Sequence, residues 1–218
     1  MVSLMKPTLV IMAKAPRIGT AKSRLARDIG LVSAWRVNRA LNCHTMRVTK
    51  DPRWNTVLAV ASRRDLNVDL PGVWPLKARR QAQKSGDLGA RLQHVFRSAP
   101  FGPVMVIGTD CPALRRDDLA AAISALHRAD AVLGPATDGG FWLLGLNARL
   151  AKKANFSNIR WSSSHALDDT VKAITAKKVL YIRTLTDVDD AESYRQAYCV
   201  KRRPIAETSA KRGLSTER

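Results

Sequence analysis

Asp110 is the residue around which a candidate active site can be built from the sequence. It follows Val104-Met-Val-Ile107, an apolar run that predicts a strand buried on both faces, and it stands in the turn Gly108-Thr-Asp-Cys-Pro112. Ligands of open α/β sheets bind just beyond the ends of such strands. A carboxylate placed there can hold a cation, so we predict that Asp110 is a catalytic, metal-binding residue.

A basic loop near the start of the sequence has the composition of a phosphate-binding segment. It follows an apolar predicted strand at residues 8–13, and Gly19 permits close approach of the backbone to a ligand. The helix expected after the loop adds N–H groups that suit an anion. The residues predicted to bind a nucleotide here are Lys14, Gly19, Lys22, Ser23 and Arg24. Lys22 is also a candidate catalytic residue, and a solvated basic turn is the alternative interpretation.

A second group of acids follows the last predicted strand, residues 178–185. Asp187 and Asp189 alternate around Val188, so both side chains can face the same side of an extended segment. Asp189 can then share a divalent ion with Asp110, which comes from a different strand end. Oxygen ligands favour Mg²⁺ or Mn²⁺, and such an ion neutralises charge as a phosphoryl or glycosyl bond breaks.

Two glycine-containing turns have both structural and functional interpretations. Gly86-Asp-Leu-Gly89 begins a predicted helix, where Asp87 either caps the helix or belongs to a turn that contacts a ligand. Asp138-Gly139-Gly140 is either a tight turn between two strands or a ligand-facing turn. Trp161 either stacks on a base or sugar or packs in the core.

The predicted elements alternate between strand and helix, which favours a three-layer α/β sandwich with a mostly parallel sheet. The run at residues 141–146 follows the Asp138 turn so closely that it must be antiparallel to its predecessor or leave the sheet. A short strand is possible at residues 73–76. The loops that carry the candidate residues follow strands, so we expect them to gather along one edge of the sheet.

These segments also resemble a known family. The motifs are Ala13-Lys-Ala-Pro-x-x-Gly-x-x-Lys-Ser-Arg-Leu25, Gly86-Asp-Leu-Gly-x-Arg-Leu92, Gly108-Thr-Asp-Cys-Pro112, Gly134-Pro-x-x-Asp-Gly-Gly-Phe-Trp-Leu143 and Asp187-Val-Asp189. They are similar to those of a bacterial glycosyltransferase-A-like family of mostly uncharacterised nucleotide-diphospho-sugar transferases. The motifs are more distantly similar to those of phospholactate guanylyltransferase and the molybdenum-cofactor nucleotidyltransferases.

The resemblance implies a GT-A-like fold and an enzyme that transfers a nucleotidyl or glycosyl group. It implies nucleotide binding at Lys14, Lys22 and Arg24, and metal binding at Asp110 and Asp189. The residues that it implies for the lining of the nucleotide or acceptor pocket are Gly86, Asp87, Gly89, Asp138, Gly139 and Gly140. Trp161 lies where the family has acceptor contacts. The donor would be a nucleoside triphosphate or a nucleotide-sugar.

The whole chain fits one domain at residues 1–200, followed by a basic and mobile tail at residues 201–218. Its net charge of +19 arises from 37 Lys and Arg against 18 Asp and Glu, which suggests phosphate-bearing partners or a solvated basic surface. A second hypothesis is therefore a nucleic-acid or anionic-surface binding protein on an inactive transferase scaffold. The three cysteines are isolated, so neither a disulfide framework nor a zinc site is indicated. With no signal-peptide core and no apolar run of about 20 residues, we expect a cytoplasmic protein.

Overall fold

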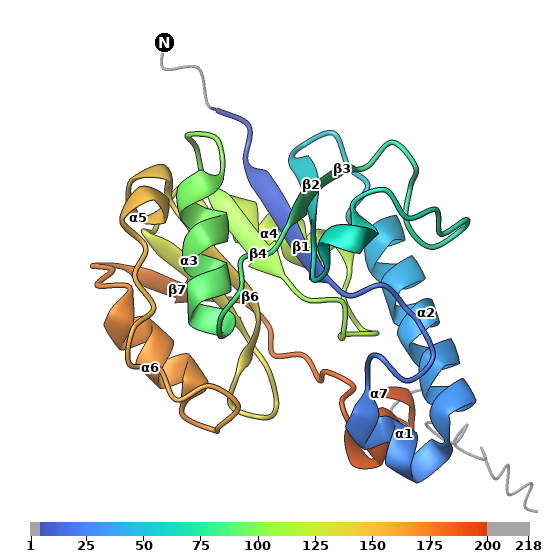
Figure 1. The fold of residues 1–218 in the computed structure, drawn as a ribbon. Helices are drawn as coiled ribbons and strands as arrows, with labels where there is room; N and C mark the ends of the chain where they lie inside the picture. Colours follow the sequence, from blue (N-terminus) through green and yellow to red (C-terminus); the bar gives the residue numbers. More distant parts are fainter. Residues whose placement is uncertain (1–4, 200–218) are drawn as a thin grey trace, which may run out of the picture.

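A computed structural model of the chain describes residues 5–199, and its centre is a seven-stranded sheet (Figure 1). The strand order is β3-β2-β1-β4-β6-β5-β7. β6 is antiparallel to β4 and β5, and the other neighbouring pairs are parallel. The strands are β1 (Thr8–Ala13), β2 (Asn55–Val60), β3 (Arg79–Ala82), β4 (Val104–Ile107), β5 (Ala131–Pro135), β6 (Phe141–Leu146) and β7 (Val179–Tyr181).

Helices cover both faces of the sheet, which confirms the predicted three-layer sandwich (Figure 1). One face packs against α2 and α4, and the other packs against α3, α5 and α6. The helices are α1 (Ser23–Ile29), α2 (Leu31–Val48), α3 (Leu88–Ser98), α4 (Arg116–Leu126), α5 (Ala148–Lys153), α6 (Ala166–Ala173) and α7 (Ala191–Cys199), with a 3-10 turn η1 (Arg63–Asp65).

Alternation along the central strands explains how the two cores form. On β1, Leu9 and Ile11 face the core shared with α2 and α4, while Val10 faces the core shared with α3. All four residues of β4 are buried, as expected of a strand covered on both faces. A smaller core around Leu25 joins α1, α2 and α7 beside the sheet (lower right in Figure 1).

Three strand predictions can be compared with the structure. The strand at residues 141–146 is present as β6 and is antiparallel to β5, as predicted. The last strand is shorter than residues 178–185, because β7 ends at Tyr181 and an isolated bridge then joins Leu185 to Ala136. The possible strand at residues 73–76 is wrong: these residues form a turn, and β3 begins at Arg79. The predicted tail, residues 201–218, lies outside the described residues.

The topology itself creates a crevice beside β1. The chain leaves β1 for β2 on one side, whereas β4 pairs with the opposite edge of β1. Ligands of open α/β sheets bind at such a reversal, outside the carboxyl ends of the strands. Lys14 directly follows β1, and Asp110 comes shortly after β4. Within residues 5–199, no helix has the length and apolar character needed to span a membrane.

Candidate functional site

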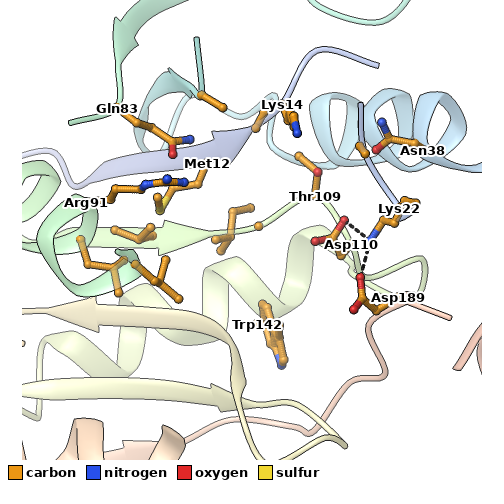
Figure 2. A pocket seen from close by; sticks show the side chains of 18 of the residues that line it. Met12, Lys14, Lys22, Asn38, Gln83, Arg91, Thr109, Asp110, Trp142 and Asp189 are labelled. Carbon is orange, nitrogen blue, oxygen red and sulfur yellow. Dashed lines mark ion pairs between the residues drawn. The ribbon is translucent and has the colours of Figure 1, made fainter. Parts of the chain in front are cut away.

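Two carboxylates from separate loops face one buried ammonium group (Figure 2). Nζ of Lys22 lies 2.6 Å from Oδ1 of Asp110 and 4.0 Å from Oδ1 of Asp189. The ammonium also donates a hydrogen bond of 2.5 Å to the carbonyl oxygen of Val188. The Lys22 side chain is 5% exposed, whereas the two carboxylates are about half exposed. A positive group therefore lies beside the pair of acids for which we predicted a metal ion.

Backbone hydrogen bonds hold the three segments of this cluster together. Val188 N donates to the carbonyl oxygen of Asp110 at 2.9 Å, and Leu25 N donates to that of Asp189 at 3.2 Å. Lys22 precedes α1 in the left-handed conformation, with φ of 57°, which residues other than glycine seldom adopt. Strained backbone of this kind persists where the surrounding structure determines it, so the direction of the Lys22 side chain is imposed by the fold.

The predicted phosphate loop is fixed to its neighbours by two further contacts. The Arg17 guanidinium lies 2.6 Å from the Asp65 carboxylate in η1, and Trp35 Nε1 donates to the carbonyl oxygen of Pro16 at 2.8 Å. Arg17 thus positions the loop. At the other end, Arg24 pairs with Oδ2 of Asp189 at 3.1 Å. Lys14 is exposed and lines the pocket described next.

Two adjoining pockets meet at the carboxylate pair. The larger has a volume of about 520 Å³ and contains five of the predicted residues: Lys14, Lys22, Ser23, Asp110 and Asp189. The smaller, of about 380 Å³, contains Asp138, Gly140 and Trp161 together with Asp187. Asp110 and Asp189 line both pockets, so they stand at the boundary between them.

The larger pocket also contains polar residues that the sequence patterns did not assign to a site: Asn38, Gln83, Arg91 and Thr109. Arg91 belongs to the Gly86–Leu92 motif, and its Nε donates to the carbonyl oxygen of Gly86 at 3.0 Å. Gln83 Nε2 donates to the carbonyl oxygen of Ala59 at 2.8 Å. No motif includes Asn38 or Gln83.

Some predicted residues support the pockets without lining either of them. Three of them are adjacent in sequence to residues that line a pocket: Gly19, Arg24 and Gly139. Gly86 accepts a hydrogen bond from Arg91, which lines the larger pocket. Asp87 caps α3, because its Oδ1 accepts a hydrogen bond of 2.8 Å from Ala90 N. A Cβ atom at Gly89 would lie 2.7 Å from the carbonyl oxygen of Phe156, so this glycine permits close packing. Leu88 is the residue by which the Gly86–Gly89 turn reaches both pockets.

Negative charge is in excess around the smaller pocket. Burial raises the pKa of Asp187, and the carboxylates of Asp138 and Asp110 raise it further. Burial likewise raises the pKa of the Cys111 thiol, with a further contribution from Asp187 and Asp110. A thiol held protonated in this way is a poor nucleophile. The carboxylates of Asp110, Asp138 and Asp187 give this pocket an acidic environment that suits a cation.

Asp110 and Asp189 fit the carboxylate ligands that a protein provides to a divalent metal ion. The described residues contain no group of three or more His, Cys, Asp or Glu arranged to hold an ion. Mg²⁺, however, commonly takes one or two carboxylates and completes its shell with water and phosphate oxygens. The two carboxylates and the surrounding acids match that requirement, and the Lys22 ammonium contacts the same pair of carboxylates.

The model of the family described as "Uncharacterized protein conserved in bacteria (DUF2064)" matches residues 44–163. The chain belongs to this family. The match includes the Gly86, Asp110, Asp138 and Trp161 segments of the DUF2064 chain. No curated protein matches it.

Solved structures similar to this DUF2064 protein establish its fold. A "putative nucleotide-diphospho-sugar transferase" from Desulfovibrio desulfuricans G20 is 22% identical, with a TM-score of 0.78 over 95% of this chain and 90% of the other. CMP:2-keto-3-deoxy-manno-octonic acid synthetase in complex with CTP is 10% identical, with a TM-score of 0.58 over 90% and 98%. Rv0371C of Mycobacterium tuberculosis H37Rv in complex with manganese is 15% identical, with a TM-score of 0.54 over 88% and 97%. The fold is therefore that of the nucleotide-diphospho-sugar transferases, as the sequence motifs implied.

Proposed function

We propose that the protein is a metal-dependent transferase that uses a nucleoside triphosphate or a nucleotide-sugar as donor. It would transfer a nucleotidyl or glycosyl group to an acceptor. The observation that supports this proposal is the position of Asp110 and Asp189 at the boundary of two pockets. A group held in one pocket can then pass to a molecule in the other across a single pair of carboxylates.

The larger pocket is the proposed donor site. Its volume of about 520 Å³ lies within the range of small-molecule sites, and Lys14 and Arg91 provide positive charge for phosphates. A similar fold is described as complexed with CTP, and another is described as complexed with manganese. Both descriptions are consistent with a nucleotide and a divalent ion as ligands of this pocket.

The proposed roles of the residues follow from their positions. Asp110 and Asp189 would hold Mg²⁺ or Mn²⁺ together with phosphate oxygens of the donor. The ion supplies neutralisation of the charge that develops on those oxygens. Lys22 would balance the charge of the two carboxylates and supply a positive group near the phosphate, since its ammonium lies 2.6 Å from Asp110 and 4.0 Å from Asp189. The acceptor would occupy the smaller pocket, beside Asp138, Gly140 and Trp161.

Calorimetry can test the proposal directly. GTP, CTP, UTP, UDP-sugars and GDP-sugars would each be titrated with and without Mn²⁺ into the protein and into Asp110→Asn. We expect binding of at least one ligand to require the metal and to weaken at least about tenfold in this variant, because one of two carboxylates is lost. Asp117→Asn, the same change at an exposed position on α4, is the control. Absence of nucleotide binding, or equal binding in both variants, would reject the proposal.

The second candidate function is binding to nucleic acid or an anionic surface, and the net charge of +19 favours it. Such binding must weaken steeply as salt is raised, because it releases counterions. Lack of retention of DNA, RNA or anionic vesicles at low salt would exclude it. A cytoplasmic location, where nucleotides are abundant, is part of the transferase proposal.

A further inference from the structure

A chain of three buried polar side chains runs beneath the larger pocket. Nε1 of Trp74 donates to Oδ1 of Asn42 at 2.9 Å, and Nδ2 of Asn42 lies 3.2 Å from Oδ1 of Asn38. All three residues are at least 96% buried, and Asn38 also lines the larger pocket. Asn38 and Asn42 are one turn apart on α2, whereas Trp74 comes from the turn before β3.

The indole group fixes the direction of every hydrogen bond in this chain. An indole N–H can only donate, so the oxygen of Asn42 must face Trp74 and its amide nitrogen must face Asn38. Asn42 Nδ2 then donates to the carbonyl oxygen of Asn38 at 3.0 Å and to its side-chain oxygen. The oxygen of Asn38 is thereby occupied, and its Nδ2 is the group left at the end of the chain.

Nδ2 of Asn38 has no hydrogen-bond partner among the described residues, although it is buried. The great majority of buried donors in proteins have a hydrogen-bond partner, and an unmet one destabilises the folded state. Figure 2 shows Asn38 projecting from α2 on the side of the pocket where Lys14, Thr109 and Lys22 lie. Lys14 and Lys22 line the same pocket as Asn38, so an anionic oxygen is the acceptor that best suits this donor.

We propose that Asn38 is a ligand-binding residue whose Nδ2 donates to a phosphate oxygen of the bound nucleotide. Asn42 and Trp74 are positioning residues that hold this donor toward the pocket. The inference rests on the proposed function, because it takes the ligand of the larger pocket to carry phosphate. It adds a determinant on α2 that belongs to none of the motifs.

The test compares phosphate affinity with stability in Asn38→Leu. Inorganic pyrophosphate is the probe, because its binding depends neither on the base nor on the acceptor. We expect its dissociation constant to rise roughly tenfold or more, since a hydrogen bond to a charged group is lost. The melting temperature of the ligand-free protein should change little, because an unmet donor is removed while Asn42 Nδ2 loses the Asn38 side-chain oxygen and keeps the Asn38 carbonyl oxygen. A purely structural asparagine would give the opposite result.

Two further variants keep the test decisive. Asn38→Asp retains the shape but presents an acceptor to the phosphate, so it must bind pyrophosphate more weakly than the charge-matched control Asn67→Asp, which is exposed and lies outside the larger pocket. Trp74→Phe removes the donor that orients the chain without touching the ligand. We expect it to raise the dissociation constant by roughly threefold to tenfold, since the amides can then flip.

The outcomes separate the inference from the proposed function. Equal pyrophosphate affinity in the protein, Asn38→Leu and Asn38→Asp would overturn the role of Asn38 and leave the transferase proposal in place. Binding of pyrophosphate that depends on Asn38, without metal-dependent nucleotide binding, would uphold the inference and reject the transferase. Absence of any pyrophosphate or nucleotide binding would overturn both.

Discussion

The Nζ atom of Lys22 lies 2.6 Å from Oδ1 of Asp110, so the predicted phosphate ligand and the predicted metal ligand form an ion pair. The pair brings together the loop after β1 and the loop after β4. Oδ1 of Asp189 lies 4.0 Å from the same Nζ atom. Because the lysine side chain is almost fully buried, its charge is held at the carboxylates. Any divalent ion that binds there must compete with this ammonium for the same oxygens.

Replacement of Lys22 by methionine tests that competition. We expect Lys22→Met to bind Mn²⁺ more tightly in the absence of nucleotide, by roughly tenfold, because the repulsion between the ammonium and the ion is removed. The affinity for pyrophosphate should fall, because a cation near the phosphates is lost. Electron paramagnetic resonance of free Mn²⁺ gives the first quantity, and calorimetry gives the second.

Lys14→Met is the matched control, since Lys14 lines the same pocket and no ion pair with a carboxylate is found for it within residues 5–199. It should weaken pyrophosphate binding but leave the Mn²⁺ affinity of the free protein within about twofold. Unchanged or weaker Mn²⁺ binding in Lys22→Met would show that the ammonium does not occupy the position of the ion.

Arg183 and Asp118 form an ion pair between two segments. Arg183 lies in the segment that leads to Asp187 and Asp189, and Asp118 lies on α4, the helix that follows Asp110. Arg183 donates to both oxygens of Asp118, at 2.5 and 2.8 Å, and to the carbonyl oxygen of Ala113 at 2.6 Å. Asp118 is 9% exposed, so Arg183→Met leaves a nearly buried carboxylate without its partner. We expect a loss of about 1–3 kcal/mol in the free energy of unfolding, below the range for fully buried pairs because the arginine is partly exposed. Urea denaturation measures it.

The control for this prediction is Arg116→Met on α4, the helix that carries Asp118. Arg116 is half exposed and lies 3.7 Å from Asp51, so its removal should change the free energy of unfolding by less than about 1 kcal/mol. Equal destabilisation by the two variants would mean that the Arg183–Asp118 pair has no special role.

The strands show which part of the fold could be predicted from the sequence. β4 was predictable because four apolar residues in a row suit a strand covered on both faces. β3 was missed because Arg79-Arg-Gln-Ala82 forms an edge strand whose side chains are exposed or half-buried. The apolar residues that suggested a strand, Val73 and Trp74, are instead buried in a turn that packs on α2.

The site shows a similar division. Asp110, Lys22 and Asp189 could be proposed because acids and lysines beside strand ends are chemically conspicuous. In the structure both carboxylates lie within 4.0 Å of the Lys22 ammonium. The ion pair itself depends on the left-handed backbone at Lys22, which no sequence pattern specifies. Asn38 gave no signal, because its buried environment depends on Trp74, a residue distant in sequence.

Gly139 is required where the Asp138 turn approaches the loop before α6. Its φ is +88°, and a Cβ atom would lie 2.5 Å from Cα of Ser164 and 2.6 Å from the carbonyl oxygen of Ser164. Backbone cannot move aside as a flexible side chain can, so we expect Gly139→Ala to lower the free energy of unfolding by about 2–4 kcal/mol. The change should also distort the smaller pocket, which contains Asp138 and Ser163.

Gly140→Ala provides the comparison for Gly139→Ala in urea denaturation. The nearest atoms to its Cβ would all belong to the Asp138 side chain, with Oδ1 at 3.1 Å, and that side chain is exposed and can rotate. The loss should therefore stay below about 1 kcal/mol. A smaller loss for Gly139→Ala than for Gly140→Ala would contradict the close approach to Ser164.

The sequence left two interpretations of Asp87 open, a helix cap and a ligand contact, and variants of this residue can distinguish them. Its carboxylate accepts from Ala90 N at 2.8 Å, and it lines neither pocket beside Asp110. We expect Asp87→Ala to lower the free energy of unfolding by about 1 kcal/mol, while Asp87→Ser, whose hydroxyl oxygen can also cap, stays within about 0.5 kcal/mol. Both variants should bind pyrophosphate as the unaltered protein does. Retained stability with a large loss of affinity in Asp87→Ser would instead show that this carboxylate contacts the ligand, and the boundary of the donor pocket would have to extend to the start of α3.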